Sequence, residues 1–421
     1  MLGVQLKIRK IVIYLYINIQ RYHIFYTLKM IKPVKRIIGA AILFGLLMSC
    51  EMAHAETADS SHINRSLLFN FGDNGSKFYR IPAIVTLSDG TLVAVADKRI
   101  DNNSDLPGRI DVVCRTSSDR GATWSPVITV AEHDSNGGYG DPALVVERNS
   151  GDILCIATHG EGLWTATPGK SARIVVMRSS DKGNTWSAPL DITDDILTSI
   201  PENDAPIKGV TGFATSGRAL QTSDGRLMFV LVVRDNPTAG QWCPLKVYAC
   251  YSDDGGYKWS SSGVCAEADG DESKVVELSD GRILMSIRNR KKGGRLFSYS
   301  SDRGHTWSPA EEHLQLIEPA CNGDLLSWKR NGKHILLHSI CSHPMDRRNV
   351  TIFASFDDGR TWPVSKTICE APSAYSALTI LDDGTVGCFL EEEAQSDNGV
   401  GFQLWFNSYN IDQLLDSSNG K

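Results

Sequence analysis

The sequence predicts an all-β protein, a six-bladed β-propeller built from four-stranded antiparallel sheets, and three observations support this fold class. An eight-residue pattern, Ser-x-Asp-x-Gly-x-x-Trp, occurs five times. A glycine-containing turn signal occurs six times and alternates with it, each time between short apolar runs. Helical patterns are nearly absent, apart from a short stretch at 411–415.

The eight-residue pattern is typical of a corner between two strands. Its aspartate can accept N–H bonds within the turn, its glycine permits positive φ, and its tryptophan can fold back as an apolar plug. The five copies lie at 117–124, 179–186, 252–259, 300–307 and 355–362. We therefore expect five of the nine tryptophans to have a packing role.

The second turn signal marks tight hairpins between the apolar runs. Its glycines are Gly90, Gly151, Gly225, Gly281, Gly332 and Gly384. They lie roughly 50–75 residues apart, which suits one four-stranded blade. Six hairpins interleaved with five corners predict six blades, and the last blade needs no corner if the end of the chain closes the ring.

The composition is that of an ordinary globular protein. The 421 residues include 43 Lys+Arg and 49 Asp+Glu, a net charge of −6, with 42 % hydrophobic residues. This balance excludes a strongly basic nucleic-acid binder and an acidic disordered chain. The histidines have no metal-ligand spacing, and no dinucleotide or phosphate-loop glycine motif occurs, so no cofactor is expected.

Residues 1–55 are expected to contain an upstream extension and, at 31–55, a secretory signal, and residues 56–421 to form the propeller. Basic residues precede an apolar run at 37–48, which is too short to span a bilayer comfortably. Cleavage is expected after Ala55, with lipidation at Cys50 as the alternative. Residues 1–29 are interpreted as a non-native upstream extension from a misplaced start, with a second apolar segment as the alternative. The protein is then secreted or periplasmic, or a lipid-anchored surface protein without a membrane span.

The nine cysteines after Cys50 are expected to be buried free thiols, because most lie inside apolar runs and none forms Cys-x-x-Cys. One disulfide, joining Cys243 to Cys250 or Cys265, stays open as an alternative in an oxidising compartment.

A Tyr-Arg-Ile-Pro motif at 79–82 places Arg80 directly before an apolar strand, where a charge needs a reason. Together with the repeated corner pattern, this motif resembles the sialidases (neuraminidases), six-bladed propellers that carry both features. The resemblance covers about residues 65–410.

The resemblance implies three arginines that bind the carboxylate of sialic acid. Arg80 matches the first and Arg288 the second. Arg347 is favoured as the third over its neighbour Arg348. Arginine suits this task because its planar guanidinium stays charged and can bind a carboxylate with two hydrogen bonds.

The resemblance also implies a tyrosine nucleophile, for which sialidases are the known exception among glycosidases. Tyr375 matches it, and Glu272 matches its base, with Glu277 as a rival for the base. A phenol suits an anomeric carbon that already bears a carboxylate, because a carboxylate nucleophile would be repelled.

The segment after the first hairpin resembles the family segment in which an arginine precedes the catalytic aspartate by six residues. Asp105 is then the general acid/base, with Asp101 as its rival, and Arg99 is a substrate-proximal arginine. Asp141 matches a position that contacts polar substituents of the sugar. Trp164 and Trp242 are left open between lining the substrate pocket and packing.

The predicted function is that of a retaining exo-α-sialidase, acting on terminal sialic acid of glycoproteins, glycolipids or oligosaccharides. Two alternatives stay open: a non-catalytic glycan-binding propeller, and a trans-sialidase or intramolecular trans-sialidase.

Overall fold

The described part of the chain is the propeller itself. The computed structural model describes residues 62–415, apart from 168, 201–210, 235–239, 263–264, 268 and 397–398. The predicted export segment, with its two processing positions Cys50 and Ala55, lies outside the described residues.

The first two blades follow the chain from the inner strand outwards. Blade one contains β2 (Phe78–Thr86), β3 (Leu92–Arg99), β4 (Ile110–Ser117) and β5 (Ile128–Ala131). Blade two contains β6 (Gly138–Val146), β7 (Ile153–Gly160), β8 (Arg173–Ser179) and β9 (Leu190–Asp191), and the short β11 (Gly217–Arg218) pairs parallel to β6.

The middle blades repeat this order. In blade three, β10 (Thr211–Ala214) and β12 (Leu220–Gln221) both pair with β13 (Leu227–Arg234), followed by β14 (Lys246–Ser252) and β15 (Ser260–Ser261). Blade four contains β16 (Gly270–Glu277), β17 (Ile283–Asn289), β18 (Gly293–Ser300) and β19 (Glu311–Glu318).

The last two blades share one long strand. Blade five contains β20 (Asp324–Arg330), β21 (Lys333–Cys341), β22 (Arg348–Ser355) and the first part of β23 (Val364–Ile380). The second part of β23 is the inner strand of blade six, which continues with β24 (Val386–Ser396), β25 (Gly399–Tyr409) and β1 (His62–Asn70). The ring is therefore closed by the first strand of the described chain, paired antiparallel with the last.

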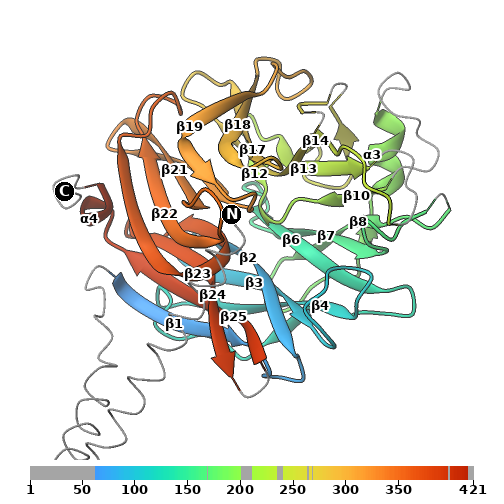
Figure 1. The fold of residues 1–421 in the computed structure, drawn as a ribbon. Coiled ribbons are helices and arrows are strands. Elements are labelled where there is room, and N and C mark those ends of the chain that lie inside the picture. The colour runs from blue at the N-terminus through green and yellow to red at the C-terminus, as the bar shows by residue number, and fades with distance from the viewer. Residues whose placement is uncertain are drawn as a thin grey trace, which may run out of the picture. The chain divides into compact units, whose positions relative to one another are not determined.

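The predicted fold class is confirmed, and Figure 1 shows the sheets following one another around a common centre. The buried apolar side chains form six clusters, one at each interface between adjacent blades. Val93 and Val95 on β3 join the cluster toward blade two, whereas Leu92 and Ala94 join the cluster toward blade six. This alternation is what a strand buried on both faces requires.

The repeated corner pattern forms the turn expected of it. In the first copy, Ser117 Oγ accepts a hydrogen bond from the Gly121 N–H (2.9 Å) and Asp119 Oδ1 accepts one from the Thr123 N–H (2.9 Å). The Trp124 ring packs edge-on against Phe406 of blade six, 5.3 Å between ring centres. All five corner tryptophans take part in the apolar cluster shared with the preceding blade.

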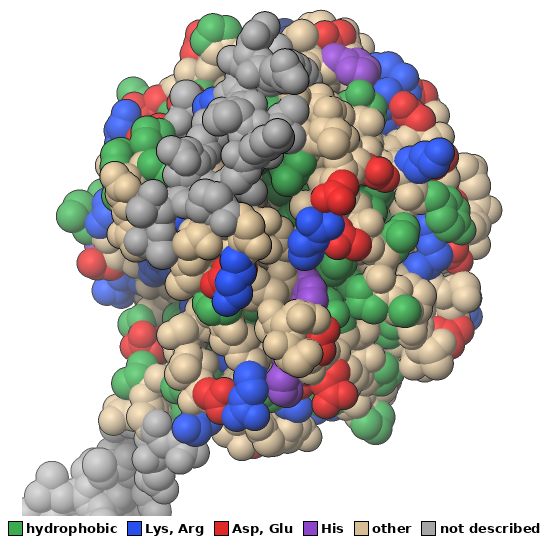
Figure 2. Space-filling model, turned by 90° about the vertical axis from the view of Figure 1, so that its right-hand side faces the viewer, with side chains coloured by type: hydrophobic (Ala, Val, Ile, Leu, Met, Phe, Trp, Pro, Cys, Tyr) green, Lys and Arg blue, Asp and Glu red, His purple; other side chains and the backbone are tan. Residues whose placement is uncertain are grey.

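Two short helices complete the described fold: α3 (Thr193–Ser199) and α4 (Ile411–Leu415). The second lies at the predicted stretch, whereas α3 was not predicted, because seven residues give too little periodicity. On the side carrying α3, charged side chains of both signs are interspersed among apolar ones (Figure 2). The nine described cysteines are free thiols, and most are buried, so no Cys243 disulfide is present among them.

Candidate active site

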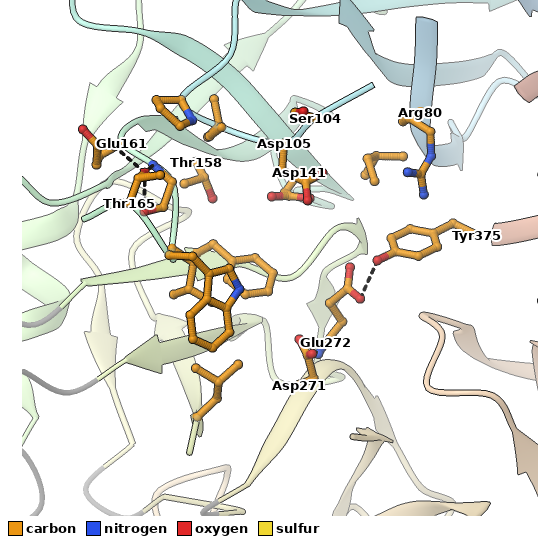
Figure 3. Close-up of a pocket in the computed structure, with 18 of the residues that line it drawn as sticks. Arg80, Ser104, Asp105, Asp141, Thr158, Glu161, Thr165, Asp271, Glu272 and Tyr375 are labelled. Atoms are coloured by element: carbon orange, nitrogen blue, oxygen red, sulfur yellow. Dashed lines mark hydrogen bonds between the residues drawn. The ribbon is translucent and has the colours of Figure 1, made fainter. Parts of the chain in front are cut away.

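A cavity of about 500 Å³ opens where the inner strands converge. It is lined by β2, β6, β7, β10, β16, β17 and β23, together with the loops that follow β3 and β7 and the residues directly before β14 and β22. Its ionisable lining residues are Arg80, Asp105, Asp141, Glu161, Asp271, Glu272, Arg288, Arg347 and Tyr375. In Figure 3, Tyr375 and Glu272 point toward each other, with Asp105 and Asp141 lying apart from them.

Tyr375 and Glu272 form a hydrogen-bonded pair from two different blades. The Tyr375 hydroxyl donates to Glu272 Oε2 at 2.7 Å, and both residues are buried. Arg288 Nη1 lies 2.5 Å from Glu272 Oε2 and 3.3 Å from the Tyr375 hydroxyl. Burial, and then the Glu272 charge, raise the pKa of Tyr375 well above its ordinary value, while Arg288 and Arg347 oppose the shift. The phenol is therefore held neutral, next to a group that can accept its proton.

Arg80 is fixed by a carboxylate that the sequence did not reveal, Glu391 on β24. Arg80 Nε and Nη2 donate to its two oxygens at 2.7 and 3.2 Å. The same carboxylate accepts the backbone N–H groups of Ile81 (2.8 Å) and Tyr375 (2.9 Å). Ile81 has φ 62°, rare for a β-branched residue, at an irregularity in β2. Glu391 thus holds the strained Arg-Ile-Pro turn and the tyrosine strand together.

The two neighbouring candidates for the third arginine have different surroundings. Arg347 lines the cavity, with its guanidinium carbon 5.8 Å from the centre of the Tyr375 ring. Both residues are exposed, but Arg348 does not line the cavity and donates to the Glu370 carbonyl at 3.2 Å. Arg288 and Arg347 therefore face Tyr375 together with Arg80, whereas Arg348 does not.

Asp105 lies in the loop after β3, with its side chain 79 % exposed. Arg99 Nη2 donates to Asp105 Oδ1 at 2.7 Å and lies 3.1 Å from Asp97 Oδ2, and Arg99 Nη1 donates to the Asn103 carbonyl. Arg99, predicted to be substrate-proximal, does not itself line the cavity. Its side chain is 2 % exposed, and it holds the Asp105 loop from behind.

Asp141 lines the cavity close to the Asp105 loop. Its backbone has φ 57°, and its N–H donates to Asp97 Oδ1 at 3.1 Å. Burial, and then the charges of Asp97, Asp105 and Glu272, raise its pKa well above the ordinary value. Burial also raises the pKa of Asp97 to about 7, although Arg99 opposes the shift.

Comparison with known proteins identifies the family. Residues 90–388 match the BNR repeat-like domain family. The chain is 31 % identical over 348 residues to a sialidase of Bacteroides fragilis (strain YCH46), covering 76 % of this chain and 61 % of the relative. It is 30 % identical over 287 residues to a sialidase of Clostridium perfringens, covering 65 % of this chain and 70 % of the relative.

The chain belongs to the sialidase family. It spans about three fifths of the length of its Bacteroides fragilis relative. A solved structure of a Hadza microbial sialidase superposes with a TM-score of 0.71 at 28 % identity, covering 83 % of this chain and 69 % of that one. The likeness thus extends over most of the propeller.

The rival residues lie away from the cavity of this sialidase-family chain. Asp101 pairs with exposed Arg109, and Glu277 accepts hydrogen bonds from Ser223. Trp164 lines the cavity, whereas Trp242 is 64 % exposed and does not.

No group of three or more His, Cys, Asp or Glu side chains suited to a metal ion occurs in the described ranges. Among the same residues, no helix has the length and apolar character needed to cross a membrane.

Proposed function

We propose that this chain is a retaining exo-α-sialidase that hydrolyses terminal sialic acid from glycoproteins, glycolipids or oligosaccharides. The observation that carries the proposal is the 2.7 Å hydrogen bond between the Tyr375 hydroxyl and Glu272, inside a cavity lined by three arginines and by Asp105. A nucleophile, its base, an anion-binding cluster and a second carboxyl group are the parts this reaction needs.

The arginines supply the binding of the substrate carboxylate. Arg80, Arg288 and Arg347 line one cavity and surround Tyr375, so an anion bound by them lies beside the nucleophile. Guanidinium groups bind carboxylates through paired, charge-assisted hydrogen bonds. This arrangement selects a sugar whose anomeric carbon bears a carboxylate.

Two displacements then complete the reaction. In the first, the Tyr375 oxygen bonds to the anomeric carbon, its proton passes to Glu272, and the leaving oxygen departs with a proton from Asp105. In the second, Asp105 takes a proton from water, the water oxygen bonds to the anomeric carbon, and Tyr375 leaves and regains its proton from Glu272. Two inversions give retention of configuration.

The neutral state of Tyr375 supports its role. Burial holds its pKa well above the ordinary value, so the phenol carries no charge toward the substrate carboxylate. Its oxygen gains negative character only as Glu272 takes the proton.

The test is turnover of an aryl α-sialoside and of sialyllactose, with NMR of the first product formed. We expect the α-anomer of free sialic acid first, and Tyr375→Phe should lose most of the turnover, since it lacks the nucleophilic oxygen. A well-folded wild type without turnover would refute the proposal, and would instead favour a glycan-binding propeller. An anhydro-sialic acid as the main product would indicate internal transfer instead of hydrolysis. A sialylated acceptor sugar as the main product would indicate intermolecular transfer.

We further propose that residues 31–55 direct export of the propeller. The support is the basic segment followed by the uncharged apolar run and Ala53-His54-Ala55. Mass spectrometry of the mature N-terminus tests this: a chain starting at Glu56 indicates cleavage after Ala55, and a lipid-modified Cys50 indicates anchoring. An unprocessed chain in the cytoplasm would contradict both.

A further inference from the structure

Asp97 is a buried carboxylate directly behind the cavity wall. Its side chain is 1 % exposed, and it does not line the cavity. Its Oδ1 accepts the Asp141 backbone N–H at 3.1 Å, and its Oδ2 lies 3.1 Å from Arg99 Nη2. Asp97 therefore contacts Asp141 directly, through its backbone N–H, and is linked to Asp105 through Arg99.

One guanidinium nitrogen serves two carboxylates here. Arg99 Nη2 is 2.7 Å from Asp105 Oδ1 and 3.1 Å from Asp97 Oδ2. The Arg99 side chain is 2 % exposed and has no other carboxylate within ion-pair distance among the described residues. The two aspartates consequently compete for a single cation.

The cluster contains more carboxylates than cations. Asp97, Asp105 and Asp141 lie around the Arg99 guanidinium, Arg80 is a second cation that faces Asp105, and burial raises the pKa of both Asp97 and Asp141. The charged or titratable groups that face these three from neighbouring elements are Arg80 on β2, Cys155 on β7 and Glu272 on β16. Interacting carboxylates of this kind share protons rather than titrating independently.

We propose that Asp97 is a positioning residue that shares Arg99 with Asp105, and so allows Asp105 to hold a proton in one step of the reaction and to lose it in the next. When ionised Asp97 takes the guanidinium, Arg99 holds Asp105 less tightly, so that Asp105 can carry the proton that goes to the leaving oxygen. When the proton rests on Asp97, Arg99 stabilises ionised Asp105, which then activates water. The inference rests on the proposed acid/base role of Asp105.

Asp97→Asn tests this sharing. Without the Asp97 charge, Arg99 binds Asp105 alone and favours its ionised form. The basic limb of the kcat/KM–pH profile should move to lower pH by about one unit, a tenfold effect, for sialyllactose. A nitrophenyl sialoside should be affected far less, because a phenolate leaves with little help from an acid.

The matched control is Asp111→Asn on β4. Asp111 is also a buried carboxylate of blade one, accepting the His133 N–H at 3.0 Å and lying 3.5 Å from Lys98 Nζ, but it does not line the cavity. Asp111→Asn should leave the kcat/KM–pH profile unchanged, even where the substitution lowers the free energy of unfolding.

Arg99→Gln keeps the proposal testable if Asp97→Asn does not fold, since it should move the same limb to higher pH. An unmoved limb in either folded variant, or equal shifts for both substrates, would overturn the inference while leaving the proposed function intact. An inactive wild type would instead remove the proposed function itself.

Discussion

At the scale of single residues, the site depends on where a side chain points rather than on its chemical type. Arg347 and Arg348 are adjacent and chemically identical, yet only Arg347 lines the cavity. Its guanidinium faces the Tyr375 ring, whereas that of Arg348 donates to the Glu370 carbonyl at the surface.

This pair gives a prediction with a built-in control. Arg347→Ala should reduce kcat/KM for a sialoside by about 10- to 100-fold. This loss corresponds to the about 1.5–3 kcal/mol that a hydrogen bond to a charged group contributes. Arg348→Ala should leave kcat/KM close to the wild-type value, because Arg348 does not line the cavity. Steady-state kinetics measure kcat/KM of both variants, and equal reductions of kcat/KM would contradict the assignment of Arg347.

Lys274 gives a prediction about pH and stability. It is fully buried, its ammonium donates to Asn322 Oδ1 at 2.9 Å, and burial lowers its pKa to about 8 although Asp324 and Glu272 oppose the shift. Above this pKa the folded chain has released a proton that the unfolded chain keeps until about pH 10.4, so the free energy of unfolding should rise with pH in this window.

We expect Lys274 to contribute a rise of about 2–3 kcal/mol between about pH 7 and about pH 10, and Lys274→Met to lack it. Urea unfolding of both proteins across this range measures the difference. Parallel stability profiles would show that the buried ammonium is not penalised.

At the scale of elements, the corners can be predicted from sequence because their causes are local. Ser117, Asp119 and Gly121 lie within five residues of one another and bond to each other. The same holds for the hairpin glycines, such as Gly90 with φ 87° and Gly151 with φ 78°.

The parts of the site that sequence reasoning missed have distant causes. Glu391 meets Arg80 across 311 residues, and only the ring closure brings them together. The signal available was a run of three glutamates at the end of an apolar strand, 391–393, where burial of a charge needs a partner. The spacing between Arg99 and Asp105 likewise does not reveal that Arg99 Nη1 and Nη2 contact Asn103 and Asp97.

Two glycines give a prediction about the corners. Gly121 has φ 86°, and a Cβ there would lie 2.2 Å from the Phe406 ring, whereas Gly151 has a similar φ of 78° and nothing within 4 Å. Gly151→Ala should cost about 1 kcal/mol for the left-handed backbone alone. Gly121→Ala should cost about 1–3 kcal/mol more through overpacking against blade six. Thermal unfolding compares them, and equal losses would show that the Phe406 ring moves aside freely.

At the scale of the whole molecule, the ring depends on β1, which covers the edge of β25 and adds Leu68 and Phe69 to the core between blades six and one. A chain starting at Ser61 should therefore unfold cooperatively and keep its turnover. A chain starting at Phe71 should leave β25 as an open, aggregation-prone edge and lose stability. Sedimentation and thermal unfolding of the two chains test this, and equal behaviour would show that blade six is stable with three strands.

The hydrogen bonds that Glu391 makes to Arg80, Ile81 and Tyr375 also limit when the site can assemble as the chain is synthesised. Arg80 is synthesised 311 residues before Glu391, and the strand that carries Tyr375 directly precedes the strand of Glu391. Contacts so distant in sequence form only after the intervening chain has been made and its loop-closure entropy overcome. The hydrogen bond between Tyr375 and Glu272, and those that Glu391 makes across the ring, therefore form only after blade six has been made.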